Sequence, residues 1–118
     1  MKRYREGRDK GCTWLMKKLH ADGRFGDGQP DVREYYKVPC AFLVCGESEA
    51  AGRLLNWVRK HGITPEGDFG PRPPEGKDEY WYTYTNSWVV IGAHRLTWTY
   101  MDLHYCGGVP LVLSTTSA

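Results

Sequence analysis

The chain has 118 residues, enough for one ordinary domain with a hydrophobic core but not for two independent ones. Its composition is that of a globular protein, with 41% hydrophobic and 25% charged residues, and Tyr and Trp make up most of a 14% aromatic share. The net charge of +2 gives no electrostatic case for nucleic-acid binding, and no apolar run is long enough to predict a membrane span.

The N-terminus and the cysteines together predict a compartment. Met1 is followed by charged residues rather than by the apolar core of a secretory signal. Cys12, Cys40, Cys45 and Cys106 lack the paired spacing of a zinc ribbon or a redox motif. We therefore expect reduced, mostly buried thiols and a cytoplasmic location.

The N-terminal segment is predicted as a loose polar arm over residues 1–8 and an amphipathic helix over about residues 10–20. Its basic side chains are interpreted as a solvated face rather than a binding patch. Gly23 ends the segment, because a glycine just past the last periodic residue can adopt a left-handed conformation. The apolar positions of this helix fall on one face: Cys12, Leu15, Met16 and Leu19.

The middle of the chain predicts two helices of different kinds. The first, about residues 34–45, carries apolar stripes on two sides, which is typical of a helix buried on two sides. Pro39 is expected in its first turn, so the helix could begin nearer Val38. The second, about residues 49–61, has one apolar face and ends at Gly62.

The last third of the chain begins with a loop over residues 63–78 that contains four prolines. A helix that is apolar almost all round is predicted over about residues 84–93, followed by a mixed helix over about residues 94–103. The tail over residues 107–118 receives no secondary-structure prediction. All 118 residues are expected to form a single domain.

One short sequence motif occurs twice in the chain, at equivalent places among these predicted elements. Asp22-Gly23-Arg24-Phe25-Gly26 is matched by Glu66-Gly67-Asp68-Phe69-Gly70. Each copy follows a one-faced helix and precedes an aromatic-led apolar segment, so one-faced and two-faced helices alternate. A repeat at this spacing predicts an all-α array of helical hairpins, with an inner row of helices covered by an outer row.

The segment Lys10-Gly11 to Trp14-Leu15, followed by Gly23-Arg24-Phe25, resembles the QW-type repeat of the terpenoid cyclase and protein prenyltransferase α/α-toroid family. A weaker second copy runs from Ala51-Gly52 to Gly67-Asp68-Phe69. The resemblance implies a partial α/α toroid with alternating outer and inner helices. A closed ring of that family needs more than twice as many residues, so we expect a homo-oligomer, or a second polypeptide that completes the ring.

The same resemblance implies a central apolar cavity and an apolar, possibly isoprenoid-derived small molecule as its ligand. Aromatic faces can stabilise a carbocation or stack on sugars and lipids. The alternative interpretation is that these side chains are core and rim packing. The residues expected to line the pocket are Tyr36, Trp81, Tyr82, Tyr84 and Trp88.

Asn86, His94 and Asp102 are the candidate catalytic groups of such an enzyme. Asn, His and Tyr are also the residue types that polysaccharide lyases of toroid fold use, which gives a second catalytic alternative. Asp102, His104 and Cys106 are zinc-ligand types, but they are crowded into five residues and are interpreted as an ordinary helix end. We expect no metal and no cofactor.

The preferred hypothesis is therefore a toroid-type enzyme or a piece of one. The alternative, from another class, is a non-catalytic helical repeat module that self-associates or docks a partner through the same aromatic surface.

Overall fold

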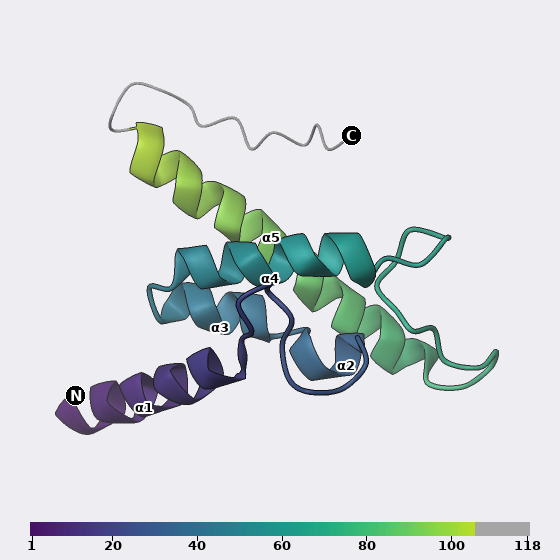
Figure 1. The fold of residues 1–118 in the computed structure, drawn as a ribbon, viewed down its shortest axis with the longest axis horizontal. Coiled ribbons are helices and arrows are strands. Elements are labelled where there is room, and N and C mark those ends of the chain that lie inside the picture. Colours follow the sequence, from purple (N-terminus) through teal and green to yellow (C-terminus); the bar gives the residue numbers. More distant parts are fainter. Residues whose placement is uncertain (106–118) are drawn as a thin grey trace.

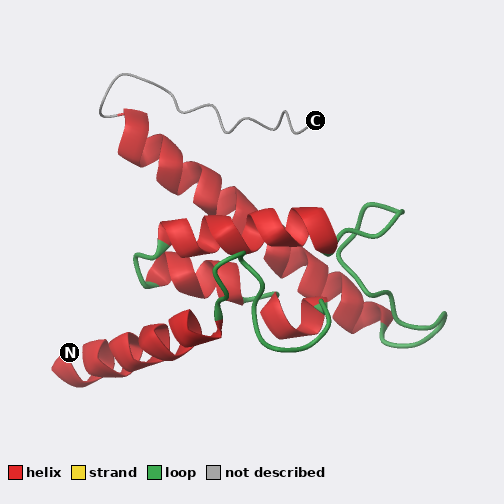
Figure 2. Ribbon diagram, in the orientation of Figure 1, coloured by secondary structure: helices red, strands yellow, loops and turns green. Residues whose placement is uncertain are grey.

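The computed structural model describes residues 1–105 of the chain, with side chains for residues 1–97. Helices joined by loops, with no strand, make up this described part, which confirms the predicted all-α class (Figure 2). None of these helices has both the length and the apolar character that crossing a bilayer requires. The helices are α1 (Lys2–Lys18), α2 (Val32–Tyr35), α3 (Val38–Val44), α4 (Ser48–His61) and α5 (Glu79–Tyr105).

Helix α1 begins at Lys2, so the loose arm expected over residues 1–8 is wrong for this structure. Lys, Arg and Glu are good helix formers, and the Glu6–Lys10 spacing adds a favourable pair of charges on one side of the helix. The helix has no buried residue and projects away from the rest of the molecule (Figure 1). Its C-terminal half approaches the core, through the partly buried Leu15 and Met16 and through Cys12.

A disulfide joins Cys12 of α1 to Cys45, which follows α3, across Cα atoms 5.9 Å apart. The expectation of four reduced thiols is therefore wrong, because the fold brings together two cysteines that are far apart in the sequence. Cys40 is free and buried, as expected. Disulfides persist mainly in oxidising compartments, so the predicted cytoplasmic location loses its support from the thiols and stays a prediction.

The predicted helix over residues 34–45 is divided into α2 and α3. Asp31 caps α2 by accepting a hydrogen bond from the backbone N–H of Arg33 at 2.9 Å. Pro39 lies in the first turn of α3, so the predicted start near Val38 is confirmed. A proline in the first turn is tolerated because that N–H has no partner within the helix.

Helix α4 matches its prediction to within one residue and ends at Gly62. Its apolar face packs against α3 and, less extensively, against α5. The side chains of this core come from α2, α3, α4 and α5: Val32, Tyr35, Val38, Phe42, Ala50, Ala51, Leu54, Trp57, Val58, Val89 and Leu96.

Helix α5 is one continuous element where two helices were expected. Gly92 does not interrupt this helix. It lies so close to α3 that a Cβ added there would contact Pro39 and Cys40. The helix is also less buried than its apolar sequence predicted: Val89 is buried, but Val90 and Ile91 are exposed. The predicted tail over residues 107–118 lies outside the described residues.

The two Gly-x-Phe-Gly loops, Gly23–Gly26 and Gly67–Gly70, have the same backbone arrangement. In the first loop a short bridge pairs Leu19 with Phe25, and in the second it pairs Ile63 with Phe69. Three backbone hydrogen bonds of the first loop have counterparts in the second. In the first loop, the N–H groups of His20, Gly23 and Gly26 donate to the carbonyls of Arg24, His20 and Lys18, respectively. In the second loop, the N–H groups of Thr64, Gly67 and Gly70 donate in the same order to the carbonyls of Asp68, Thr64 and Gly62. The repeated motif therefore specifies a repeated local structure.

Candidate binding face on helix α5

Four of the five predicted pocket residues meet on one side of α5, and we call this group, Tyr36, Trp81, Tyr84 and Trp88, the aromatic face. Residues 81, 84 and 88 share a side of the helix because their spacing follows its period. The ring of Tyr84 is central, with its centroid 6.0 Å from Tyr36, 5.7 Å from Trp81 and 6.3 Å from Trp88. All these contacts are edge-to-face, a favoured arrangement of aromatic rings. Trp81 is 58% exposed and the other three rings are half-buried, so the face is partly open to solvent.

Lys37 supplies a positive charge to this face. Its Nζ lies 5.5 Å from the ring centroids of Tyr36 and Tyr84 and 5.3 Å from that of Trp88, within the range of cation–π attraction. Hydrogen bonding to Lys37 also lowers the pKa of the Tyr84 hydroxyl. Sequence reasoning missed Lys37, although its position directly after the Tyr35-Tyr36 doublet was a usable signal.

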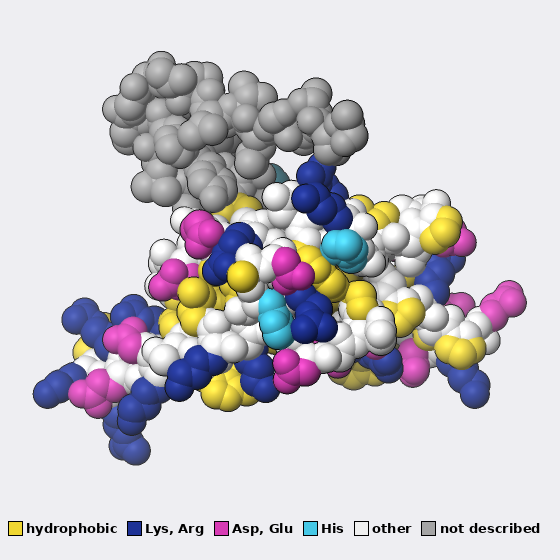
Figure 3. Space-filling model, in the orientation of Figure 1, with side chains coloured by type: hydrophobic (Ala, Val, Ile, Leu, Met, Phe, Trp, Pro, Cys, Tyr) yellow, Lys and Arg dark blue, Asp and Glu magenta, His cyan; other side chains and the backbone are white. Residues whose placement is uncertain are grey.

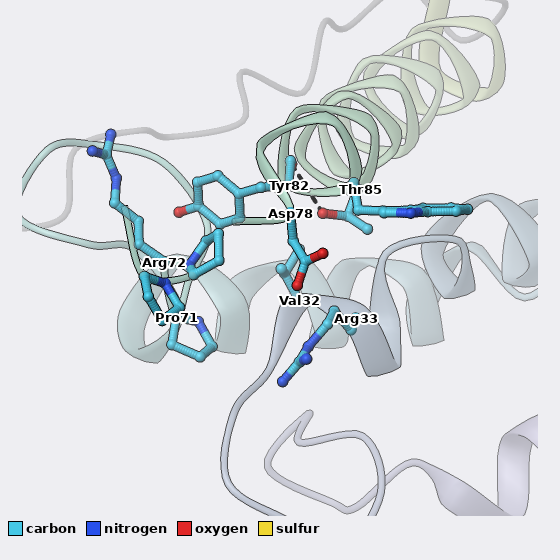
Figure 4. A pocket seen from close by; sticks show the side chains of 10 residues that line it. Val32, Arg33, Pro71, Arg72, Asp78, Tyr82 and Thr85 are labelled. Carbon is cyan, nitrogen blue, oxygen red and sulfur yellow. Dashed lines mark hydrogen bonds between the residues drawn. The ribbon is translucent and has the colours of Figure 1, made fainter. Parts of the chain in front are cut away.

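A small cavity adjoins the aromatic face and has a volume of about 170 Å³. It lies between α2, the prolines of the 63–78 loop and the first turns of α5, and Trp81 belongs to both features (Figure 4). Its two arginines are already paired, Arg33 with Asp31 at 2.6 Å and Arg72 with Asp68 at 2.6 Å. Because sites for drug-sized ligands usually exceed about 300 Å³, the cavity suits a side chain or a small group better than a whole terpenoid.

Tyr82 lies apart from the other predicted pocket residues. It follows Trp81 on the helix and is therefore turned by roughly 100° around the axis. It lines the cavity and lies beside Asp68 and Arg72. Burial, and after it the neighbouring Asp68 carboxylate, raises the pKa of its hydroxyl. Tyr82 thus supports the loop below the helix and does not belong to the aromatic face.

Asn86 holds the second Gly-x-Phe-Gly loop against α5. Its Oδ1 accepts a hydrogen bond from the N–H of Phe69 at 2.7 Å, and its Nδ2 donates to the carbonyls of Phe69 and Tyr82, each at 3.0 Å. The amide therefore has partners for its acceptor and for both of its donor hydrogens. These contacts show a structural role, and the catalytic role stays a prediction.

The other two candidate catalytic residues do not join Asn86. His94 is exposed on α5, eight residues farther along, which corresponds to about 12 Å of helix axis. The side chain of Asp102 lies outside the described residues, as do those of His104 and Cys106. The described structure thus places Asn86 and His94 at separate positions along one helix rather than around one reacting atom.

Comparisons of this chain with protein-family models, curated proteins and solved structures find no match. The four rings of the aromatic face form a partly open surface, and Lys37 lies over three of them. Such a surface can stack on, or pack against, an apolar or aromatic partner group.

Proposed function

We propose that this chain is a non-catalytic helical repeat module that binds a partner through the aromatic face of α5. The repeat is supported by the two Gly-x-Phe-Gly loops, which have equivalent backbone hydrogen bonds and each lie between two helices. In such modules each hairpin contacts its neighbours, and the exposed surfaces serve for binding.

The observation that carries the proposal is a cluster of four large aromatic rings, of which Trp81 is 58% exposed and the other three are partly exposed. Scattered exposed apolar residues are normal on a protein surface, but a contiguous group marks a site of interaction. Trp and Tyr are also the side chains that contribute most to binding at protein interfaces. Trp81 on this face is open to solvent, whereas catalysis needs groups that converge on a substrate shielded from water.

A random peptide library selected on immobilised chain tests this proposal. We expect enriched amphipathic peptides whose binding is lost with the double variant Tyr84→Ser/Trp88→Ser. Val90→Ser is the control, since Val90 is an apolar residue that is 58% exposed on α5 and lies outside the aromatic face. Peptides that bind the double variant as well as the wild type, or no enrichment at all, would contradict the proposal.

The toroid-type enzyme acting on an apolar small molecule is a second candidate, favoured by the cavity that includes Trp81. It requires a second chain that closes the ring around that cavity. Mass spectrometry of an organic extract of the purified protein tests it. An isoprenoid that is enriched with the wild type and lost with Trp81→Ala favours the enzyme, and an extract without such a compound favours the binding module.

A further inference from the structure

We propose that helix α1 binds the surface of an anionic membrane, with the helix lying along the bilayer and the side that points away from the core in contact with it. The sequence predicted only a solvated face for the basic side chains of this helix. The site is separate from the aromatic face of α5, so the proposal goes beyond the function proposed above. Three features support it: the charge of α1, the residues on its outer side and the way the helix projects.

The positive charge of the chain is concentrated in α1. Residues 2–18 carry seven of the 16 basic and two of the 14 acidic side chains, which gives this segment a net charge of +5. The other nine basic and twelve acidic side chains give the remainder of the chain a net charge of −3. Lys and Arg side chains extend along α1 at the lower left of Figure 3. Anionic lipid headgroups attract such clusters of basic residues.

The packing of α1 determines which of its sides is available. The disulfide at Cys12 and the partly buried Leu15 and Met16 turn one side toward α3 and the core. At about 100° per residue, the opposite side is formed by four exposed residues: Arg3, Lys10, Trp14 and Lys17. Glu6 and Lys18 lie at the two edges of this side, so their charges offset each other. The three basic residues, seven positions apart, therefore form a row roughly 20 Å long beside an exposed tryptophan.

Trp14 favours a membrane surface over other anionic partners. Its side chain is 59% exposed, and the Nζ of Lys18 lies 5.2 Å from the centroid of its ring. In a bilayer surface, a Trp ring enters the boundary between headgroups and acyl chains while Lys and Arg stay at the phosphates. Nucleic-acid grooves instead stack successive bases on several aromatic rings, and the outer side of α1 carries a single one.

The position of α1 lets its outer side meet a flat surface. The helix has no buried residue and projects from the rest of the molecule (Figure 1). Its 17 residues correspond to roughly 25 Å of helix axis. Salt screens charges beyond about 8 Å at physiological ionic strength, which limits the repulsion between the acidic remainder and the lipids. The basic row in direct contact with the headgroups therefore dominates the interaction.

Flotation of the full chain, with its disulfide intact, on lipid vesicles tests the proposal. The wild type should bind phosphatidylcholine vesicles that contain about one third phosphatidylserine, and should not bind vesicles of phosphatidylcholine alone. Lys10→Gln/Lys17→Gln should weaken binding about 25-fold, because each basic residue near an anionic surface contributes roughly fivefold. Lys60→Gln/Lys77→Gln is the matched control, since it removes the same charge from exposed positions outside α1, and it should weaken binding less than about threefold.

Two further variants locate the contact. Trp14→Gln should weaken binding to the anionic vesicles, and Tyr84→Ser/Trp88→Ser should leave it unchanged, because the aromatic face is a separate surface. Circular dichroism shows whether α1 keeps its helical content, and Arg3→Gln/Lys17→Gln replaces the first lysine pair if it does not.

Three results would overturn the proposal: no binding to the anionic vesicles at about 0.1 M salt, equal losses with the two lysine pairs, or binding to single-stranded RNA without binding to vesicles. Loss of vesicle binding with Tyr84→Ser/Trp88→Ser would also overturn it, because the contact would then lie on the aromatic face. The peptide selection reports on the aromatic face alone, so the proposed function can fail or stand independently of these results.

Discussion

The two Gly-x-Phe-Gly loops have the same backbone and different surroundings. Gly23 and Gly67 have almost the same positive φ, 99° and 95°, and equivalent hydrogen bonds close both loops. Gly23 is pressed against the backbone of Arg53 in α4, while a Cβ added at Gly67 would meet nothing within 4 Å. The repeated motif thus specifies the local turn, and the neighbouring helices determine how tightly each turn is packed in the fold.

The largest difference between the loops is expected from Gly23→Ala and Gly67→Ala. Both substitutions place a side chain at a positive φ, which costs about 1–2 kcal/mol. Gly23→Ala also drives a Cβ into the Arg53 carbonyl and against Trp57, and overpacking of this kind adds about 1–3 kcal/mol. We expect a total loss near 3 kcal/mol or more for Gly23→Ala in urea denaturation, against about 1–2 kcal/mol for Gly67→Ala. Equal losses would show that the close approach to α4 has no energetic consequence.

Most of the helices were predictable from the sequence, because they depend on local patterns. Periodic apolar positions and glycine stops located α4, and Pro39 located the start of α3. The missed features depend on contacts between distant segments. The Cys12–Cys45 disulfide joins two elements, and Gly92 continues α5 because α3 approaches it closely. Local sequence patterns do not predict such contacts, because the contacting residues are far apart in the chain.

The candidate site was predictable in part for the same reason. The aromatic residues of α5 follow the helical period, so three of them had to share a side, and Tyr36 joins them through the packing of α2 against α5. Tyr82 was predicted to line one pocket with the other aromatic residues; it lines the cavity together with Trp81 but points to another side of α5 than Tyr84 and Trp88. The exposure of Trp81 was also missed, because a helix that is apolar almost all round predicts burial, whereas the exposed fraction of each side chain depends on the segments that pack against it.

A medium effect is expected from the side chains that hold the two loops. Asn86→Ala removes three hydrogen bonds and leaves the N–H of Phe69 without its partner, which should cost about 1–3 kcal/mol. The first loop is held from outside by Arg53, whose Nη1 lies 3.5 Å from the carbonyl of His20 and 3.4 Å from that of Ala21. These longer contacts predict less than about 1 kcal/mol for Arg53→Ala.

Hydrogen exchange at single amides distinguishes these two supports. Asn86→Ala should speed exchange at Phe69 and leave Arg24 and Gly26 of the first loop unchanged. If Asn86→Ala instead unfolds both loops to the same degree, the amide acts on the whole core rather than on one turn.

The smallest predicted effect concerns acid and is confined to the second loop. Asp68 bonds to Arg72 and Thr64, and these contacts, with Arg72 the stronger, lower the pKa of its carboxyl from 3.8 to about 2. A carboxyl whose pKa is lower in the folded state stabilises the fold at any pH above its unfolded pKa, and this stabilisation disappears as the pH falls from about 4 to about 2. The Asp68–Arg72 pair is partly exposed, so the effect should be no more than about 1 kcal/mol. Urea denaturation between pH 5 and pH 2 should show a step that Asp68→Asn removes. The first loop has Arg24 at the position that corresponds to Asp68, so Asp22→Asn in that loop is the control and should leave the step in place. If Asp22→Asn removes the step instead, the acid sensitivity belongs to the first loop.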